Sequence, residues 1–129
     1  MASDALSLTN VNAFYGDSHI LHGVSFALRP GAVLALLGRN GAGKTTCIST
    51  IIGFLKPRDG EIKLFGEPIQ GLNPERISHL GIGLVPQGRR IFPSLTVREN
   101  LVVAQQRAKT TEKPWNIERI YDMFPRLRE

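Results

Sequence analysis

Several features of secreted and membrane-spanning proteins are missing from this sequence of 129 residues. It has a single cysteine, Cys47, so an internal disulfide is excluded and a reducing compartment is favoured. No apolar run approaches the roughly 18 residues of a membrane-spanning helix. The first four residues lack the basic flank of a secretory signal, and no apolar stretch follows them. We therefore expect a cytoplasmic protein.

The sequence also lacks a long run of charge of one sign. Its formal net charge is +5, and most of the excess lies in residues 89–129, with nine Lys/Arg against five Asp/Glu. The longest basic run there is the pair Arg89-Arg90. Basic residues that are mixed with acids favour a solvated or partner-facing surface over a nucleic-acid interface. No nucleic-acid partner is expected.

Apolar patterns predict five strands. Alternating apolar residues indicate half-buried strands at residues 6–14, 24–28 and 61–65. Continuous apolar runs indicate short strands at residues 33–37 and 82–85. The run at 33–37 is typical of a strand buried on both faces, as in a parallel sheet that helices cover.

Capping and turn residues predict four helices between these strands. One begins at Gly43, carries Ile48, Ile51 and Ile52 on its apolar stripe and ends near Gly53. Asn73-Pro74 opens a helix to about residue 80, the capping box Thr-x-x-Glu at 96–99 opens a third, and a fourth runs from about residue 116 to Pro125. The chain is therefore predicted to be an α/β domain whose first strands are antiparallel.

A glycine-rich segment, GRNGAGKT at Gly38–Thr45, matches the phosphate-binding pattern G-x-x-x-x-G-K-[ST]. Such a loop directs backbone N–H groups at a polyphosphate, and the N-terminus of the next helix adds partial positive charge. Gly41 and Gly43 permit positive φ and close approach. Lys44 is expected to contact the β- and γ-phosphates, and the Thr45 hydroxyl to ligate Mg²⁺. The predicted ATP and Mg²⁺ site comprises Gly38, Asn40, Gly41, Ala42, Gly43, Lys44, Thr45 and Thr46.

Other reactive residue types have simpler interpretations. Cys47 lies just inside the predicted helix, where a thiol can become reactive, but a small buried hydrophobic residue is the favoured interpretation. His19, His22 and His79 have no metal-ligand spacing and are taken as structural or surface residues.

The loop alone does not distinguish GTPases, small-molecule kinases and transport ATPases. The guanine-reading motif Asn-Lys-x-Asp is absent, and two or three strands precede the loop, unlike in nucleotide kinases. Tyr15-Gly16 stands 23 residues before the loop and Gln87 stands 43 residues after Lys44. Together with the loop, this pattern resembles the ATP-binding domain of ABC transporters. Residues 85–101, VPQGRRIFPSLTVRENL, are most similar to the ATPase subunits of branched-chain amino acid importers and of their urea- or amide-importing relatives.

The resemblance implies roles for residues outside the loop. Tyr15 would stack on adenine, although it could instead be a strand aromatic, with Phe14 as the expected core member. Gln87 would sense Mg²⁺ and the attacking water, so Lys44 and Gln87 are the expected catalytic residues, with Thr45 and Gln87 near the metal. Residues 89–92 would contact the membrane subunit, although Phe92 could instead pack inward.

The resemblance also implies an organisation and partners. Residues 1–88 would form the nucleotide-binding core and residues 89–129 the start of a helical subdomain. The expected partners are membrane-spanning permease subunits and a second ATPase subunit, in a homo- or heterodimer. The protein would then be peripheral on the inner face of the cell membrane.

Three elements of that family are absent from the sequence: a Leu-Ser-Gly-Gly-Gln signature, an apolar run ending in Asp-Glu, and the switch histidine. We therefore expect an N-terminal part that binds ATP weakly and hydrolyses little alone, with an unpartnered edge at residues 33–37. A non-catalytic nucleotide-binding module is one alternative. An ABC ATPase that acts on nucleic acid is another.

Overall fold

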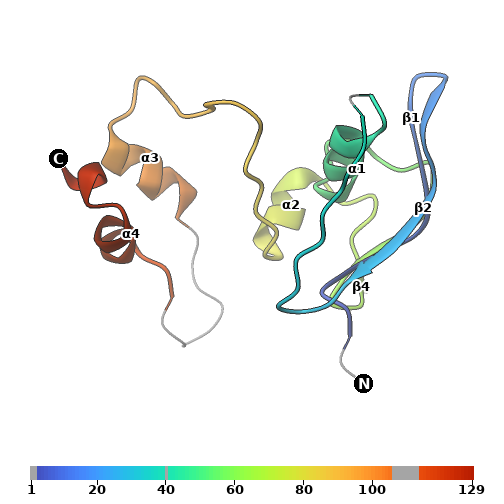
Figure 1. Ribbon diagram of the computed structural model, residues 1–129, viewed down its shortest axis with the longest axis horizontal. Helices are drawn as coiled ribbons and strands as arrows, with labels where there is room; N and C mark the ends of the chain where they lie inside the picture. The colour runs from blue at the N-terminus through green and yellow to red at the C-terminus, as the bar shows by residue number, and fades with distance from the viewer. Residues whose placement is uncertain (1–2, 40, 106–113) are drawn as a thin grey trace. The chain divides into compact units, whose positions relative to one another are not determined.

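Figure 1 shows a computed structural model of the chain, which describes residues 3–39, 41–105 and 114–129. The chain divides into two compact units, Met1–Leu84 and Val85–Glu129, and each is described by itself. Within the described ranges, none of the helices combines the length and apolar character that crossing a bilayer requires.

The first unit is built on a four-stranded antiparallel sheet in the order β2-β1-β3-β4. The strands predicted from alternation at 6–14, 24–28 and 61–65 are all present, and the first two are longer than the pattern indicated. The antiparallel first part of the predicted fold is thus confirmed. The strands are β1 (Leu6–Tyr15), β2 (Ser18–Leu28), β3 (Asp59–Leu64) and β4 (Glu67–Pro68).

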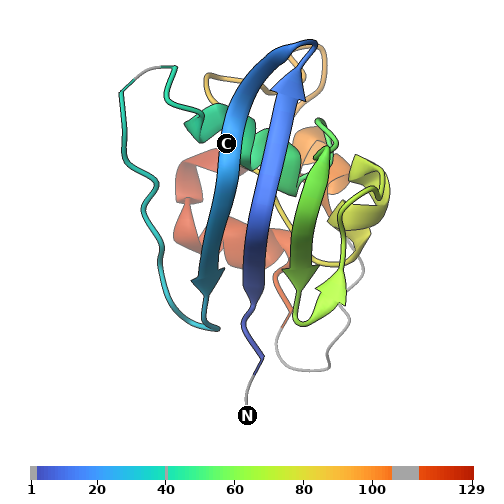
Figure 2. The same ribbon diagram turned by 90° about the vertical axis from the view of Figure 1, so that its right-hand side faces the viewer.

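Helices α1 (Lys44–Ile51) and α2 (Pro74–His79) cover one face of this sheet, and Figure 2 shows the opposite face toward the viewer. Both helices begin where the sequence predicted. In α2 the Asn73 side chain accepts a hydrogen bond from the Arg76 N–H at 2.9 Å, as a helix cap does. Burying apolar side chains between sheet and helices stabilises the unit. Its core cluster is Leu8, Val11, Ala13, Leu21, Cys47, Ile51, Ile62, Ile69 and Ile77.

The buried stripe of α1 differs in part from the prediction. Ile51 and Ile52 are buried as expected, but Ile48 is 38% exposed. The helix instead turns Thr46, Cys47 and Thr50 inward together with Ile51. These positions also share one helical face, so the buried face of α1 is rotated relative to the predicted one. The helix contains several polar residues, and the spacing of its few apolar residues did not define the buried face.

The two strands predicted from continuous apolar runs are wrong. Residues 33–37 and 82–85 adopt no strand, and Val33 and Val85 are 96% and 95% exposed. The sheet that the structure describes contains only β1 to β4, so neither segment pairs with a strand there. A parallel strand requires such neighbours to satisfy its N–H and C=O groups. Without them an apolar sequence does not by itself make a strand.

The second unit contains α3 (Val97–Ala104), α4 (Ile117–Met123) and the 3₁₀ turn η1 (Pro125–Arg128). The predicted capping box is confirmed: Thr96 Oγ1 accepts from the Glu99 N–H at 3.1 Å, and the Glu99 carboxylate accepts from the Thr96 N–H at 2.8 Å. The fourth predicted helix is also present, and the Asn116 side chain caps it at 2.9 Å.

Candidate functional site

The glycine-rich loop connects the exposed segment 33–37 to α1. It lies at the same end of the first unit as the turn between β1 and β2, as Figures 1 and 2 show. Asn40, one of the predicted phosphate-contacting residues, lies outside the described residues. Of the others, Gly43 and Thr46 are buried, Lys44 is half-buried, and Gly38, Gly41, Ala42 and Thr45 are exposed.

The two inner glycines of the loop both have a positive φ, 83° at Gly41 and 101° at Gly43. Side chains other than that of glycine are strained in this region. Gly43 has a second constraint, because a Cβ there would lie 3.2 Å from Leu21 Cδ2 and 3.6 Å from the Ile20 carbonyl oxygen. A Cβ at Gly41 would meet nothing within 4 Å. The loop is therefore fixed to β2 at its last glycine and open at its tip.

Helix α1 begins without a side-chain cap. Gly43 is its N-cap residue and has no side chain to accept a hydrogen bond, and the first turn contains no acidic residue. The Cys47 N–H donates to the Gly43 carbonyl at 2.8 Å, which starts the helical ladder. The N–H groups that precede this bond, those of residues 44–46, lie at the helix end where a bound anion can accept from them.

Lys44 is the cation that stands at the start of α1, and Arg39 is a second, exposed cation in the loop. Its ammonium group donates a hydrogen bond to the Gly38 carbonyl, so the side chain reaches back from the helix to the first residue of the loop. Thr45, beside it, keeps its hydroxyl in an exposed side chain. Thr46 is buried and its carbonyl accepts from Thr50 Oγ1 at 2.7 Å, so its contribution toward a ligand would be its N–H. A cation, a hydroxyl and helix-end N–H groups are the donor set that ATP·Mg²⁺ requires.

Cys47 is 4% exposed, and burial raises the pKa of its thiol. A higher pKa means less thiolate and less reactivity. The interpretation of Cys47 as a small buried hydrophobic residue is confirmed.

Tyr15 ends β1 at the hairpin turn, opposite Ser18, and 51% of it is exposed. Phe14, the expected core member, is not in the core. Its ring stacks on His19 with a centroid distance of 4.2 Å, and the Arg58 guanidinium lies 3.5 Å from its centre. The cause is strand alternation: Ala13 points into the core, so Phe14 points away from it.

Gln87 lies in the second unit and is exposed, and its backbone carbonyl accepts from Arg90 Nε at 3.2 Å. The adjacent apolar pair Ile91 and Phe92 is 68% and 55% exposed. The Asn100 side chain holds this segment through both backbone groups of Phe92, at 2.9 and 3.2 Å. An exposed apolar pair on an anchored segment is a feature of interaction surfaces.

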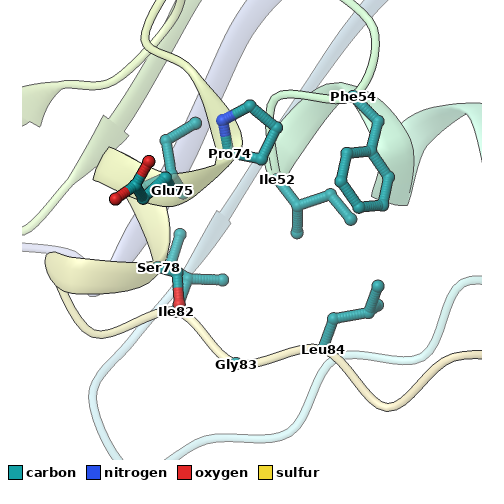
Figure 3. A pocket seen from close by; sticks show the side chains of 9 residues that line it. Ile52, Phe54, Pro74, Glu75, Ser78, Ile82, Gly83 and Leu84 are labelled. Carbon is teal, nitrogen blue, oxygen red and sulfur yellow. The ribbon is translucent and has the colours of Figure 1, made fainter. Parts of the chain in front are cut away.

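A pocket in the first unit lies between the end of α1 and α2 (Figure 3). Apolar side chains such as Ile52, Phe54 and Leu84 surround it, and Glu75 is the one ionisable residue of its lining. It therefore offers no cationic group for a phosphate.

Sequence reasoning missed two groups of residues near the hairpin. Ile20 and Leu21 of β2 pack against Gly43. Two neighbouring apolar residues in a strand carry no sequence signal that they contact the loop. Asn12, on the outer face of the sheet, bonds His19 Nε2 at 2.9 Å and Asp59 at 2.6 Å. The alternation that places Asn12 and Phe14 on one face was the available signal for this second group.

Comparison with known proteins identifies the protein family to which the chain belongs. A sequence profile described as ABC transporter matches residues 21–127, so the chain belongs to the ABC transporter family. A crystal structure of a nucleotide-free ATP-binding cassette from an ABC transporter superposes with a TM-score of 0.73 at 28% sequence identity, covering 97% of this chain and 53% of that one.

Individual relatives carry out different tasks. Over 124 residues the chain is 36% identical to the high-affinity branched-chain amino acid transport ATP-binding protein BraG of Pseudomonas aeruginosa. The aligned region covers 96% of this chain and 53% of BraG. Over 103 residues it is 41% identical to the Nod factor export ATP-binding protein I of Paraburkholderia xenovorans, covering 80% of this chain and 33% of that protein. The chain thus spans about half the length, or less, of these relatives.

Proposed function

We propose that this chain binds ATP·Mg²⁺ with the loop at Gly38–Thr45 and the first turn of α1. The observation that carries the proposal is the junction at Gly43. There a left-handed glycine, packed on β2, leads into a helix whose N-terminus has no side-chain cap and carries Lys44. A polyphosphate would supply the acceptors that this junction lacks.

Each predicted site residue has a place in this proposal. On binding, the Lys44 ammonium would leave the Gly38 carbonyl and contact the β- and γ-phosphates. The Thr45 hydroxyl would hold Mg²⁺, whose charge would neutralise part of the phosphate charge. The exposed ring of Tyr15 is available to stack on adenine. The family resemblance would give Gln87 a role near the metal and the attacking water. The organisation that goes with these roles is a nucleotide-binding core at 1–88 and the start of a helical subdomain at 89–129.

The finer proposal is that the chain belongs to the ATPase subunit of an importer of branched-chain amino acids. It is supported by the segment at residues 85–101 and by the similarity to BraG. The partners would be permease subunits, contacted through Ile91 and Phe92, and a second ATPase subunit. Such an assembly would work at the cytoplasmic face of the membrane. An importer of urea or amides is the alternative that keeps the same site.

We further propose that the 129-residue chain binds ATP·Mg²⁺ and hydrolyses little of it alone. The sequence holds no signature motif and no apolar run followed by Asp-Glu. Phosphoryl transfer to water depends on positioned charges, so the loop without these groups supports binding more than turnover.

Binding of ATP·Mg²⁺ to the chain and to Lys44→Ala tests the proposal. Losing the charged contact should weaken the affinity by about tenfold to a hundredfold. Lys56→Ala, which removes an exposed lysine just after α1, is the matched control and should bind as the unsubstituted chain does. Equal affinity of Lys44→Ala and the control would exclude the loop as the site.

Turnover is measured on the same samples. Hydrolysis at about 1 s⁻¹ or faster that Lys44→Ala abolishes would show that the chain is a competent ATPase by itself. Binding without turnover would agree with an ATP-binding component that does not hydrolyse ATP alone, and also with a non-catalytic nucleotide-binding module.

A further inference from the structure

Gly43 rests on the side chain of Leu21. Gly43 is buried, and a Cβ built on it would come within 3.2 Å of Leu21 Cδ2, so the two residues are in close contact. The neighbouring Ile20 carbonyl oxygen and Ile20 Cγ2 would lie 3.6 and 3.7 Å away. The loop continues into helix α1 at Gly43, and residues of β2 pack against it there.

Leu21 itself is held firmly. It is 4% exposed, belongs to the core cluster of the first unit, and lies opposite Ala13 of β1 in the sheet register. Ala13 is fully buried. The support under Gly43 is therefore part of the central strand pair and not a surface side chain that can turn away.

We propose that Leu21 is a positioning residue for the phosphate loop. Leu21 would not contact the phosphates. By packing against Gly43 it would fix the position of that residue relative to β2, and therefore the positions of the N–H groups at the start of α1. This inference rests on the proposed ATP-binding function of the loop.

The physical reason is that Gly43 has no side chain with which to hold its own position. Its left-handed backbone is kept in place by the surface on which it packs. Removing most of the Leu21 side chain leaves a void under Gly43, and the loop can sink into it. Hydrogen bonds from N–H groups to a phosphate weaken steeply as distance and angle depart from their optimum. A shift of the loop should therefore reduce triphosphate binding.

Leu21→Ala tests this, with Leu8→Ala as the matched control. Leu8 is the same residue type, is 2% exposed in the same cluster, and lies on β1 between Phe26 and Ile62. The two substitutions remove the same atoms from one core, so their effects on stability should be similar. The affinity for ATP·Mg²⁺ should fall by about tenfold or more in Leu21→Ala and by less than about twofold in Leu8→Ala.

A conservative substitution at the same position tests whether the side-chain volume of Leu21 is what the loop requires. Leu21→Met keeps nearly the same volume and should restore the affinity to within about threefold of the unsubstituted chain. If Leu21→Ala does not fold, Leu21→Val, which removes one carbon, is judged by the same comparison against Leu8→Val.

The inference is overturned if the Leu21 variant keeps its affinity, or if the Leu8 variant loses as much. Both results presuppose an unsubstituted chain that binds ATP·Mg²⁺. Absence of binding in the unsubstituted chain would overturn the proposed function itself, and this inference with it.

Discussion

Gly60→Ala should destabilise the first unit more than any other glycine substitution that leaves the phosphate loop untouched. Gly60 is in β3 and has φ of +96°. It faces the irregular part of β1, where the register shifts between Thr9 and Asn12. A Cβ on Gly60 would lie 2.5 Å from the Asn10 carbonyl oxygen and 2.6 Å from Val11 Cα. These are backbone atoms of a paired strand, so the clash cannot be relieved by rotating a side chain.

The magnitude follows from three terms. Alanine in the left-handed region costs about 1–2 kcal/mol, and the less flexible unfolded chain offsets about 0.4–1 kcal/mol of that. The steric term adds about 1–3 kcal/mol, as in other overpacked sites. We expect Gly60→Ala to lower the free energy of unfolding by about 1–5 kcal/mol.

Gly66→Ala is the control for the backbone term. Gly66 has φ of +83°, but a Cβ there would meet nothing within 4 Å. Its substitution should cost about 1 kcal/mol. Urea unfolding of both variants, followed by circular dichroism, gives the two values. Equal losses for Gly60→Ala and Gly66→Ala would refute the close approach of β1 and β3 at this position.

Three further predictions concern the cap of α3 and the thiol of Cys47. Thr96→Ala should destabilise α3 by about 1 kcal/mol in thermal unfolding, and Thr96→Ser, which can keep both bonds of the capping box, should not. Native Cys47 should react with iodoacetamide far more slowly than the urea-unfolded chain; equal rates would contradict its burial. Because burial raises the pKa of Cys47, its contribution to stability is complete below the unfolded value of about 8.5 and is lost as pH rises through the higher folded value. This alkaline loss should be absent in Cys47→Ala.

Local signals in the sequence were sufficient for the starts of the helices and for the backbone conformation of the two inner glycines of the loop. Asn73 and Thr96 accept hydrogen bonds from residues three positions later, so the pattern that predicts each cap contains both partners. The positive φ of Gly41 and Gly43 follows from the loop motif in the same way. Such features depend on a few neighbouring residues, and the sequence shows them all.

Features that depend on distant residues were not predictable in this way. The apolar run at 33–37 has the composition of a buried strand, yet pairing needs a second strand that composition does not supply. The approach of Gly60 to Asn10 and the contact of Leu21 with Gly43 each join segments that only the folded sheet brings together. The inward and outward order of Ala13 and Phe14 was available from strand alternation, but the preference for burying aromatic residues outweighed it.

The most direct measurement for the central claim is the change of backbone amide resonances when ATP·Mg²⁺ is added to isotope-labelled chain. We expect the largest shifts at Gly41, Gly43 and residues 44–46, and Lys44→Ala should need about tenfold to a hundredfold more ATP·Mg²⁺ to produce them. The basic pair Arg89-Arg90 should respond weakly, since scattered surface charge binds anions only loosely. Shifts concentrated at that pair, or none at the loop under saturating ATP·Mg²⁺, would contradict the account.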